Sequence, residues 1–202
     1  MRGGPISNDR RTREVGHIEP KRTILLMVEG ESEAVYFNRV GRLSDRFSIR
    51  TKVSRDKVCT DIIKNCVKEA ERLGLEDDDL RIAVFDLDVV DESLLKESLS
   101  LAGNRGVMVM TSNLSFEIWL LMHFEKGSRL YSQDDYERRL SELLGRDYVK
   151  AKGLGKDLNP ASIMDAIERG RDSLPVPDPQ LCKTTHNTST LWSIMQLILN
   201  DG

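Results

Sequence analysis

Short apolar runs alternate along the chain with longer segments of helical periodicity. Residues 23–28, 82–85 and 107–110 are continuous apolar runs, typical of strands buried on both faces of a sheet. Residues 47–53 alternate apolar and polar positions, which indicates a strand with one wet face near the sheet edge. Because strands that alternate with helices favour parallel pairing, the sequence predicts a parallel or mostly parallel sheet.

Helical spacing of apolar residues predicts helices between these strands. The helix after the first strand should begin with Ser32 as its N-cap and run to Val40. Segments 59–73 and 92–101 each place apolar side chains on one side. Segment 116–124 is apolar nearly all round, so this helix should be buried.

The pattern changes from Gly127 onward and becomes mainly helical. Residues 131–144 predict a charged amphipathic helix, Asn159 opens another helix, and residues 188–190 begin a final one. The predicted fold class is therefore α/β, with a mostly parallel sheet flanked by helices and an additional helical subdomain. The predicted organisation comprises a flexible basic arm (residues 1–20), an α/β core (21–126) and a C-terminal helical region packed on the core (127–202).

Composition narrows the class of protein. The 202 residues, 39% of them hydrophobic, suit one α/β domain with an appended subdomain, or two small domains. The formal net charge of −3 does not suggest a bulk nucleic-acid or membrane binder, so any nucleic-acid contact must use local basic patches. No apolar run approaches the roughly 20 residues that span a bilayer, and no signal peptide is recognisable, so we expect a cytoplasmic protein with no membrane partner.

The three cysteines, Cys59, Cys66 and Cys182, form no CxxC pair and have no histidine cluster to accompany them. A zinc site or a disulfide framework is therefore not expected, and a reducing cytoplasm fits this usage. Cys59 and Cys66 are expected to lie on one helix as small apolar residues.

Carboxylates follow two of the predicted strands. Glu29 and Gly30 follow the first apolar run, and Asp86 and Asp88 end a third strand expected over residues 81–88. Because side chains alternate along a strand, the two aspartates should point to the same side. At a separation of about 4 Å and an effective dielectric near 20, such a pair repels by roughly 4 kcal/mol. A divalent cation would remove that cost, and hard oxygen ligands suit Mg²⁺ or Mn²⁺.

A structural role for each of these acids is the alternative interpretation. One of the aspartates could cap the helix that starts near residues 91–93. Glu29, close to the start of a helix, could stabilise the helix dipole. Open α/β sheets also bind ligands at the carboxyl edge of their strands, where Glu29 would lie. Both interpretations stay open on the sequence alone.

The apolar helix over residues 116–124 contains two polar side chains. A buried Glu117 would need a hydrogen-bonding or ionic partner, or a raised pKa. Trp119 is expected to pack in the core rather than stack on a base. His123, near the end of the helix, is expected to make a structural contact there, with a catalytic role as the alternative.

A glutamate-glycine pair after one strand, followed by Asp-x-Asp after a later one, resembles the TOPRIM fold of topoisomerases, primases and OLD-family nucleases. The further matches resemble the RloB family and run from Thr23 toward the C-terminus. The chain departs from that family's pattern at Leu87, where a basic residue is usual, and at Trp192, where histidine is frequent. The matching segments are Glu29-Gly30-Glu31 with Tyr36-Phe37, residues 84–88, residues 112–124, residues 148–150 and residues 187–190.

The resemblance implies a TOPRIM-like core whose metal cluster is Glu29, Asp86 and Asp88. It implies that Glu117 is a fourth acid or a support for the cluster. Lys150, or another base in the loop from Lys150 to Lys156, would offset charge on the scissile phosphate. If the aspartates raise its pKa, Glu29 could serve instead as a general base.

The function that follows from the resemblance is a Mg²⁺- or Mn²⁺-dependent nuclease. It would act on RNA or DNA in bacterial anti-phage defence, with a possible ATPase partner. The alternative is a non-catalytic sensor or adaptor that binds a nucleic acid or a phage component and signals to such a partner. A nucleotide-binding regulator is a weaker third hypothesis, since the sequence contains no P-loop and no GxGxxG motif.

Overall fold

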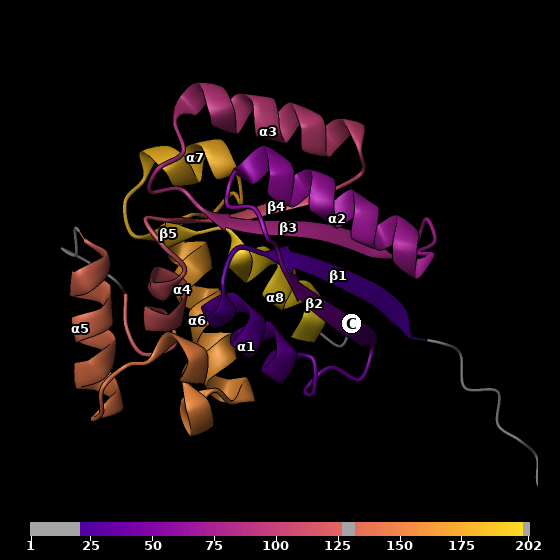
Figure 1. The fold of residues 1–202 in the computed structure, drawn as a ribbon. Helices are drawn as coiled ribbons and strands as arrows, with labels where there is room; N and C mark the ends of the chain where they lie inside the picture. Colours follow the sequence, from indigo (N-terminus) through magenta and orange to yellow (C-terminus); the bar gives the residue numbers. More distant parts are fainter. Residues whose placement is uncertain (1–20, 127–131, 200–202) are drawn as a thin grey trace, which may run out of the picture.

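The computed structural model describes residues 21–126 and 132–199. The expected basic arm, residues 1–20, lies outside the described residues, as does Tyr131 at the expected start of a helix. Within the described part, five strands form one sheet in the order β2-β1-β3-β4-β5 (Figure 1). The strands are β1 (Arg22–Val28), β2 (Phe47–Val53), β3 (Leu80–Asp86), β4 (Met108–Asn113) and β5 (Thr188–Ser189).

The sheet is mostly parallel, as predicted. Strands β2, β1, β3 and β4 run in one direction, and only the short β5 is antiparallel to its neighbour β4. The register aligns Val28 with both Val53 and Val84, and Asp86 with Ser112. The carboxyl ends of the parallel strands therefore meet along one edge of the sheet, which is where open α/β sheets bind ligands.

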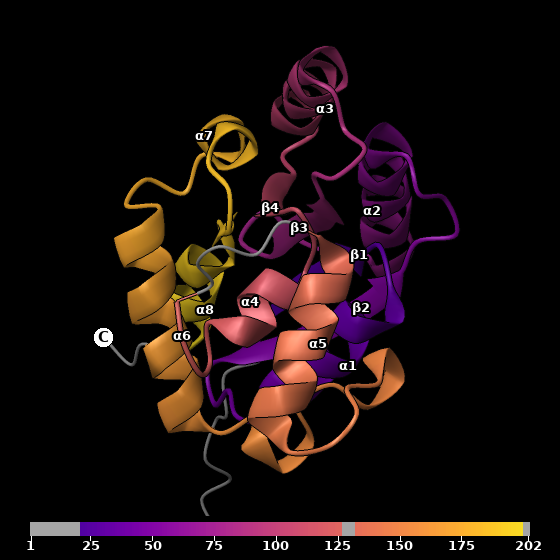
Figure 2. The same cartoon turned by 90° about the vertical axis from the view of Figure 1, so that its left-hand side faces the viewer.

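Helices cover both faces of the sheet (Figures 1 and 2). One face carries α2 (Cys59–Leu73), α3 (Glu92–Asn104) and the short α7 (Pro179–Thr184). The other carries α1 (Glu31–Val40), α4 (Glu117–Leu121), α6 (Pro160–Ser173) and α8 (Leu191–Leu199), while α5 (Gln133–Leu144) lies outside α4. Two short 3-10 turns, η1 (Lys150–Lys152) and η2 (Gly155–Asp157), connect α5 to α6.

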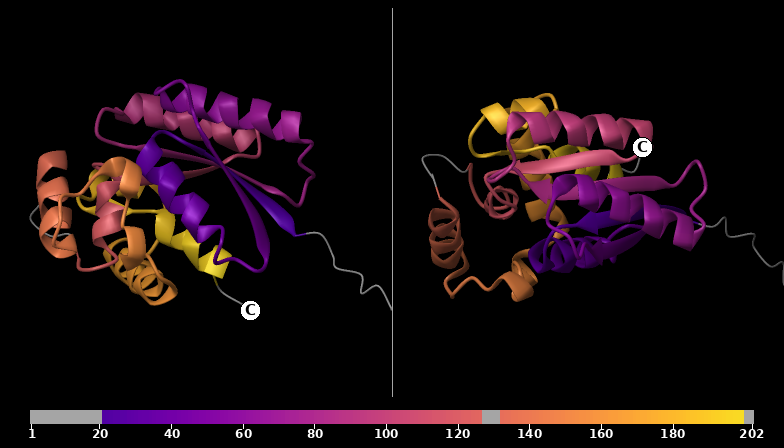
Figure 3. Two further views of the ribbon diagram at one scale, coloured as in Figure 1. Left: turned by 60° about the horizontal axis from the view of Figure 1, so that its bottom comes forward. Right: turned by 45° about the horizontal axis from the view of Figure 1, so that its top comes forward.

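Side chains alternate along the central strands, so each strand contributes to the apolar cores on both faces of the sheet. In β1, Leu25 and Met27 pack with α2, whereas Ile24, Leu26 and Val28 pack with α1 and the helices beyond it. A strand with helices on both faces must be apolar at every position, which explains its continuous apolar run. The core on the α1 face also contains residues of α5, α6 and α8, so the C-terminal helices share one apolar cluster with β1 and α1. Figure 3 shows α6 and α8 on the same side of the sheet as α1.

The third strand ends earlier than predicted, so the argument from strand alternation does not extend to Asp88. β3 ends at Asp86. The next residue, Leu87, is fully buried, and its amide donates to the carbonyl oxygens of Ser112 and Leu114 at 3.0 and 3.2 Å. Asp88 is exposed and lies in the loop beyond the end of β3, so strand alternation does not set the direction of its side chain.

Other boundaries also differ from the sequence predictions. The N-cap of α1 is Gly30 and not Ser32, which is buried within the first turn. Helix α7 and strand β5 are not predicted by the sequence pattern, and α8 begins at Leu191. Cys59 and Cys66 do lie together on α2 as buried residues, as expected. Within the described residues, no helix combines the length and apolarity needed to cross a membrane.

Candidate metal-binding acidic pocket

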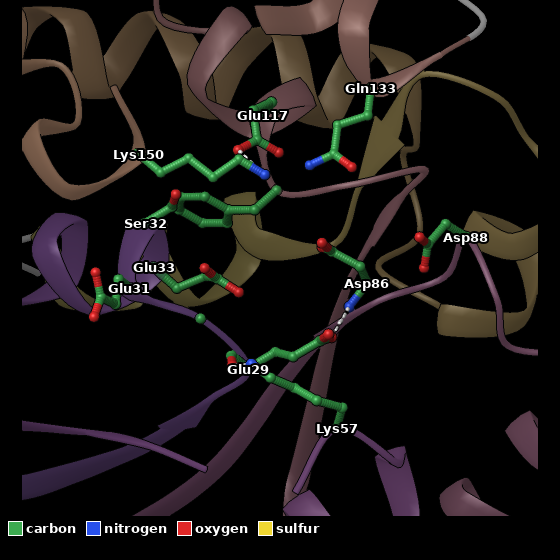
Figure 4. A pocket seen from close by; sticks show the side chains of 12 residues that line it. Glu29, Glu31, Ser32, Glu33, Lys57, Asp86, Asp88, Glu117, Gln133 and Lys150 are labelled. Atoms are coloured by element: carbon green, nitrogen blue, oxygen red, sulfur yellow. Dashed lines mark hydrogen bonds and ion pairs between the residues drawn. The ribbon is translucent and has the colours of Figure 1, made fainter. Parts of the chain in front are cut away.

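A cavity of about 390 Å³ opens at the carboxyl edge of β1 and β3, beside the start of α1 and α4 (Figure 4). In Figure 4, Glu33, Asp86 and Glu117 point toward the same central space, while Glu31 is turned away from it. Two cations, Lys57 and Lys150, border the cavity as well. The acids that line it are Glu29, Glu31, Glu33, Asp86, Asp88 and Glu117.

Glu29 links the ends of the first and third strands. It follows β1 directly, and its Oε2 accepts a hydrogen bond from the Asp86 amide at 3.2 Å. Lys57 Nζ donates to the main-chain carbonyl oxygen of Glu29. Burial raises the pKa of Glu29, with a further contribution from Asp88, although the Asp86 amide and Lys57 oppose the shift. The side chain therefore ties two adjacent strands together, which a simple helix-dipole role does not require.

Asp86 lies at the centre of the acidic cluster. It is the last residue of β3, and the aligned end of β1 brings Glu29 next to it. Burial raises the pKa of Asp86 well above its ordinary value, and the charges of Glu33, Glu29 and Glu117 raise it further. An ionised Asp86 is thus unfavourable until a positive charge enters the cavity.

Glu33 is a site residue that the sequence analysis missed. Its side chain is only 4% exposed, and burial, together with the charges of Glu29 and Glu117, raises its pKa to about 7. Gly30 makes room for it, because a Cβ atom at Gly30 would lie 3.0 Å from Glu33 Oε2. A signal was present: Glu33 shares the helical spacing of the buried Tyr36, so periodicity places this acid on the inner face of α1.

Glu117 has the partners that its burial demands. The carboxylate is 2% exposed, at the start of α4. Ser115 Oγ donates to its Oε2 at 2.7 Å, and Tyr148 Oη donates to its Oε1 at 3.2 Å. Lys150 Nζ lies 3.7 Å from the same Oε1. The prediction that a buried Glu117 needs a partner is confirmed.

Lys150 and Tyr148 reach the pocket from the segment between α5 and α6. Lys150 Nζ also lies 3.2 Å from Glu137 Oε1, on α5. Burial lowers the pKa of Lys150, but the charges of Glu117, Glu137 and Asp86 outweigh it and the net shift is upward. Tyr148 Oη is also 3.4 Å from Ser32 Oγ, so one phenol connects α1 with α4. From the sequence, Tyr148 is only part of a matching motif and has no predicted role.

Asp88 borders the same cavity from its rim. Figure 4 shows it to one side of Asp86. It is exposed, and its Oδ1 accepts a hydrogen bond from the Val89 amide at 2.8 Å. Neither it nor Asp86 caps the following helix, because Asp91 Oδ1 accepts the Leu94 amide at 2.8 Å. The capping alternative for these two aspartates is therefore wrong.

His123 and Trp119 form part of the support behind α4. His123 is buried, its Nε2 lies 3.2 Å from Tyr36 Oη, and its Nδ1 lies 3.0 Å from the Trp119 carbonyl oxygen. Burial lowers the pKa of His123 to about 4, so the ring is neutral near pH 7. The expected structural contact of His123 is confirmed, and Trp119 packs in the core as predicted. Neither residue lines the cavity.

The oxygen donors of this cavity fit a hard divalent cation in chemistry. Glu29, Glu33 and Asp86 all have raised pKa values, burial being the largest cause in each case. A bound cation would offset the cost of ionising them, and carboxylate oxygens suit Mg²⁺ or Mn²⁺. Within residues 21–126 and 132–199, no three acidic, histidine or cysteine side chains already converge closely enough to hold an ion. Side-chain rearrangement would therefore accompany binding.

The fold and the pocket define an α/β protein with a candidate ligand site, lined by acidic side chains, at the carboxyl edge of its sheet. A family model described as RloB-like protein matches residues 24–197. This match covers most of the chain, and the protein belongs to the RloB-like family. No curated protein and no solved structure gives a significant match to the chain.

Proposed function

We propose that this protein is a metal-dependent nuclease with a TOPRIM-type core, hydrolysing phosphodiester bonds in RNA or DNA. The observation that carries the proposal is the meeting of Glu29, Glu33 and Asp86 in one cavity at the carboxyl edge of adjacent strands. The order of a glutamate after the first strand and an aspartate at the end of the third supports a TOPRIM-type core. Membership of the RloB-like family supports the same assignment.

The proposed ligands of the ion are Glu29, Glu33 and Asp86, with Asp88 approaching from the rim. When bound, Mg²⁺ or Mn²⁺ supplies a Lewis acid that polarises the phosphate and lowers the pKa of a coordinated water. As the alternative to binding the ion, Glu29 would accept a proton from an attacking water, a role that its raised pKa suits.

The remaining residues of the pocket act on the substrate phosphate or hold the acids in place. Lys150, held by Glu117 and Glu137, presents a positive charge to a nonbridging phosphate oxygen. Tyr148 and Ser115 fix the Glu117 carboxylate through two hydrogen bonds. Glu117 thereby keeps Lys150 at the cavity and adds to the negative field that attracts the ion.

A cleavage assay with a matched pair of variants tests the proposal. Single-stranded and duplex DNA, single-stranded RNA and tRNA are incubated with Mg²⁺, Mn²⁺ or a chelator. We expect cleavage only with a metal ion, and a loss of at least about 100-fold in Asp86→Asn, since the central donor is removed. Asp45→Asn, at an exposed position before β2, is the control and should cleave like the wild type. Unchanged cleavage by Asp86→Asn would refute the site.

The proposal extends to the setting that the family resemblance implies, which is anti-phage defence with an ATPase partner. A non-catalytic sensor or adaptor is the second candidate, favoured by one observation: the acids of the described residues are not already arranged around an ion. Calorimetry with Mn²⁺ separates the two candidates. A nuclease requires saturable binding that weakens in Asp86→Asn, whereas a sensor requires no metal at these acids.

A further inference from the structure

Strand β2 carries positive charge along an open edge of the sheet. It pairs with β1 on one side and has no strand on the other within the described residues (Figures 1 and 3). Within the segment 50–57, four bases stand against one acid, Asp56, although the whole chain has a net charge of −3. We call the four exposed bases, Arg50, Lys52, Arg55 and Lys57, the basic strip.

The basic strip leads from the edge of the sheet to the acidic pocket. Arg50 and Lys52 are two residues apart on β2, so their side chains lie on one face of the sheet. They pair with Leu25 and Met27 of β1. Because β2 runs parallel to β1, its carboxyl end lies at the same edge as the pocket. The loop after β2 carries the remaining two bases of the strip, and Lys57 itself lines the cavity.

Most of this positive charge is not neutralised. Arg50 and Arg55 form no ion pair with any residue that the structure describes. Lys52 is exposed and its Nζ lies 3.7 Å from Glu69 Oε1, which Arg72 already contacts at 2.7 Å. Lys57 contacts a main-chain carbonyl oxygen, and the Asp56 carboxylate accepts from an asparagine amide. The strip is therefore available to an external anion.

Arg50 is the end of the basic strip that lies away from the pocket. Arg50 borders a shallow hollow that also contains Glu76, Asp78 and Asp79. Lys21 and Arg22 line the same hollow, so the charges there balance and add no positive surface beyond Arg50. The positive surface thus extends from the middle of β2 to the pocket.

We propose that the basic strip binds the phosphates of a nucleic-acid strand and guides it into the acidic pocket; this inference rests on the proposed nuclease function. Side chains two residues apart on a strand are separated by about 7 Å, a spacing similar to that of successive phosphates. Pairing of two copies through β2 is disfavoured, because it would bring two basic strips together. Phosphate contacts of this kind position a strand without reading its sequence.

Binding in a chelator tests the strip without requiring catalysis. Fluorescence anisotropy measures the affinity of labelled single-stranded DNA and RNA at about 50 to 200 mM salt. The test variant is Arg50→Gln/Lys52→Gln/Arg55→Gln, which leaves Lys57 at the pocket intact. We expect its Kd to rise at least 10-fold, and its salt slope to fall by about 2, since each single-strand phosphate contact contributes roughly 0.7.

The matched control removes the same number of charges from another face. Lys64→Gln/Lys68→Gln/Arg105→Gln alters a basic surface between α2 and α3 and should bind like the wild type. Equal weakening in both triple variants, wild-type affinity in the test variant, or no binding by the wild type would overturn the proposal. Aggregation of the test variant with unchanged affinity would also overturn it and would assign the bases to edge protection.

The outcomes for the strip and for the nuclease proposal are separable. If the wild type binds in a strip-dependent way but never cleaves, the nuclease proposal fails and the strip stands. If the wild type cleaves and the test variant binds and cleaves equally well, the strip fails and the nuclease proposal stands.

Discussion

The buried carboxyl of Glu33 gives the sharpest prediction about the pocket. Its pKa is about 7 in the folded protein and 4.5 in the unfolded chain. Between these values the unfolded state loses the proton while the folded state keeps it, so the free energy of unfolding falls as the pH rises. A difference of about 2.5 between the two pKa values corresponds to about 3 kcal/mol, because one pKa unit is worth about 1.4 kcal/mol.

We therefore predict that Glu33→Gln makes the metal-free protein more stable than the wild type above pH 7, by about 3 kcal/mol. Below about pH 4.5 the difference should vanish, since both states of the wild type then carry the proton. Urea unfolding in a chelator measures this difference at several pH values. The neutral amide also lowers the repulsion on Asp86, which acts in the same direction.

The test uses the difference in the free energy of unfolding between variant and wild type, because other groups titrate in the same pH range. His123 has its pKa lowered to about 4, so its burial costs stability as the pH falls from 6.5, which opposes the Glu33 effect in the wild-type curve. Glu31→Gln is the control, since Glu31 is exposed on the same helix, and its effect should be within about 0.5 kcal/mol. A stability difference for Glu33→Gln that does not change with pH would refute the reasoning.

Three further substitutions test the supports of the pocket and of the core. Tyr148→Phe removes the 3.2 Å hydrogen bond to the α4 carboxylate and should lower kcat about 10-fold in a steady-state cleavage assay, with nearly unchanged melting temperature; a full wild-type rate would contradict the positioning role. Lys150→Met should lower kcat about 100-fold with little change in KM, and a pure KM effect would instead assign it to binding. Gly170→Ala should cost about 1–3 kcal/mol in urea unfolding, because the new Cβ would lie 2.9 Å from Trp192 Cβ, whereas Gly103→Ala, with open space around it, should not destabilise.

The buried strands and the meeting of their ends were predictable from the sequence. Continuous apolar runs mark strands covered on both faces, and parallel strands place their carboxyl ends at one edge, which brings Glu29 to Asp86. Glu33 was within reach of the same reasoning, because helical spacing places it with Tyr36 on the inner face of α1. The glycine among the acids after β1 indicates a turn, which hides the helical spacing that begins at Glu31.

Two features depend on long-range contacts that no local pattern contains. The direction of Asp88 was predicted from strand alternation, but β3 ends at Asp86, two residues earlier than that argument requires. β5 is only two residues long and forms through pairing with β4, supported by the 3.0 Å contact between Ser112 Oγ and Ser189 Oγ. These residues are 77 positions apart, and the intervening sequence does not indicate that they meet.

The position of α8 has a consequence for how the protein matures. This helix packs against α6, and its apolar residues belong to the same cluster as Tyr36 and Ile118. Tyr36 lies one turn after Glu33 on α1, and Ile118 is next to Glu117 on α4. The walls of the acidic pocket therefore rest on a segment that is synthesised after every acid that lines the pocket. A nascent chain that stops before α8 has the acids of β1 and β3 but lacks the framework that fixes them, so the finished pocket arises only after α8 has been made.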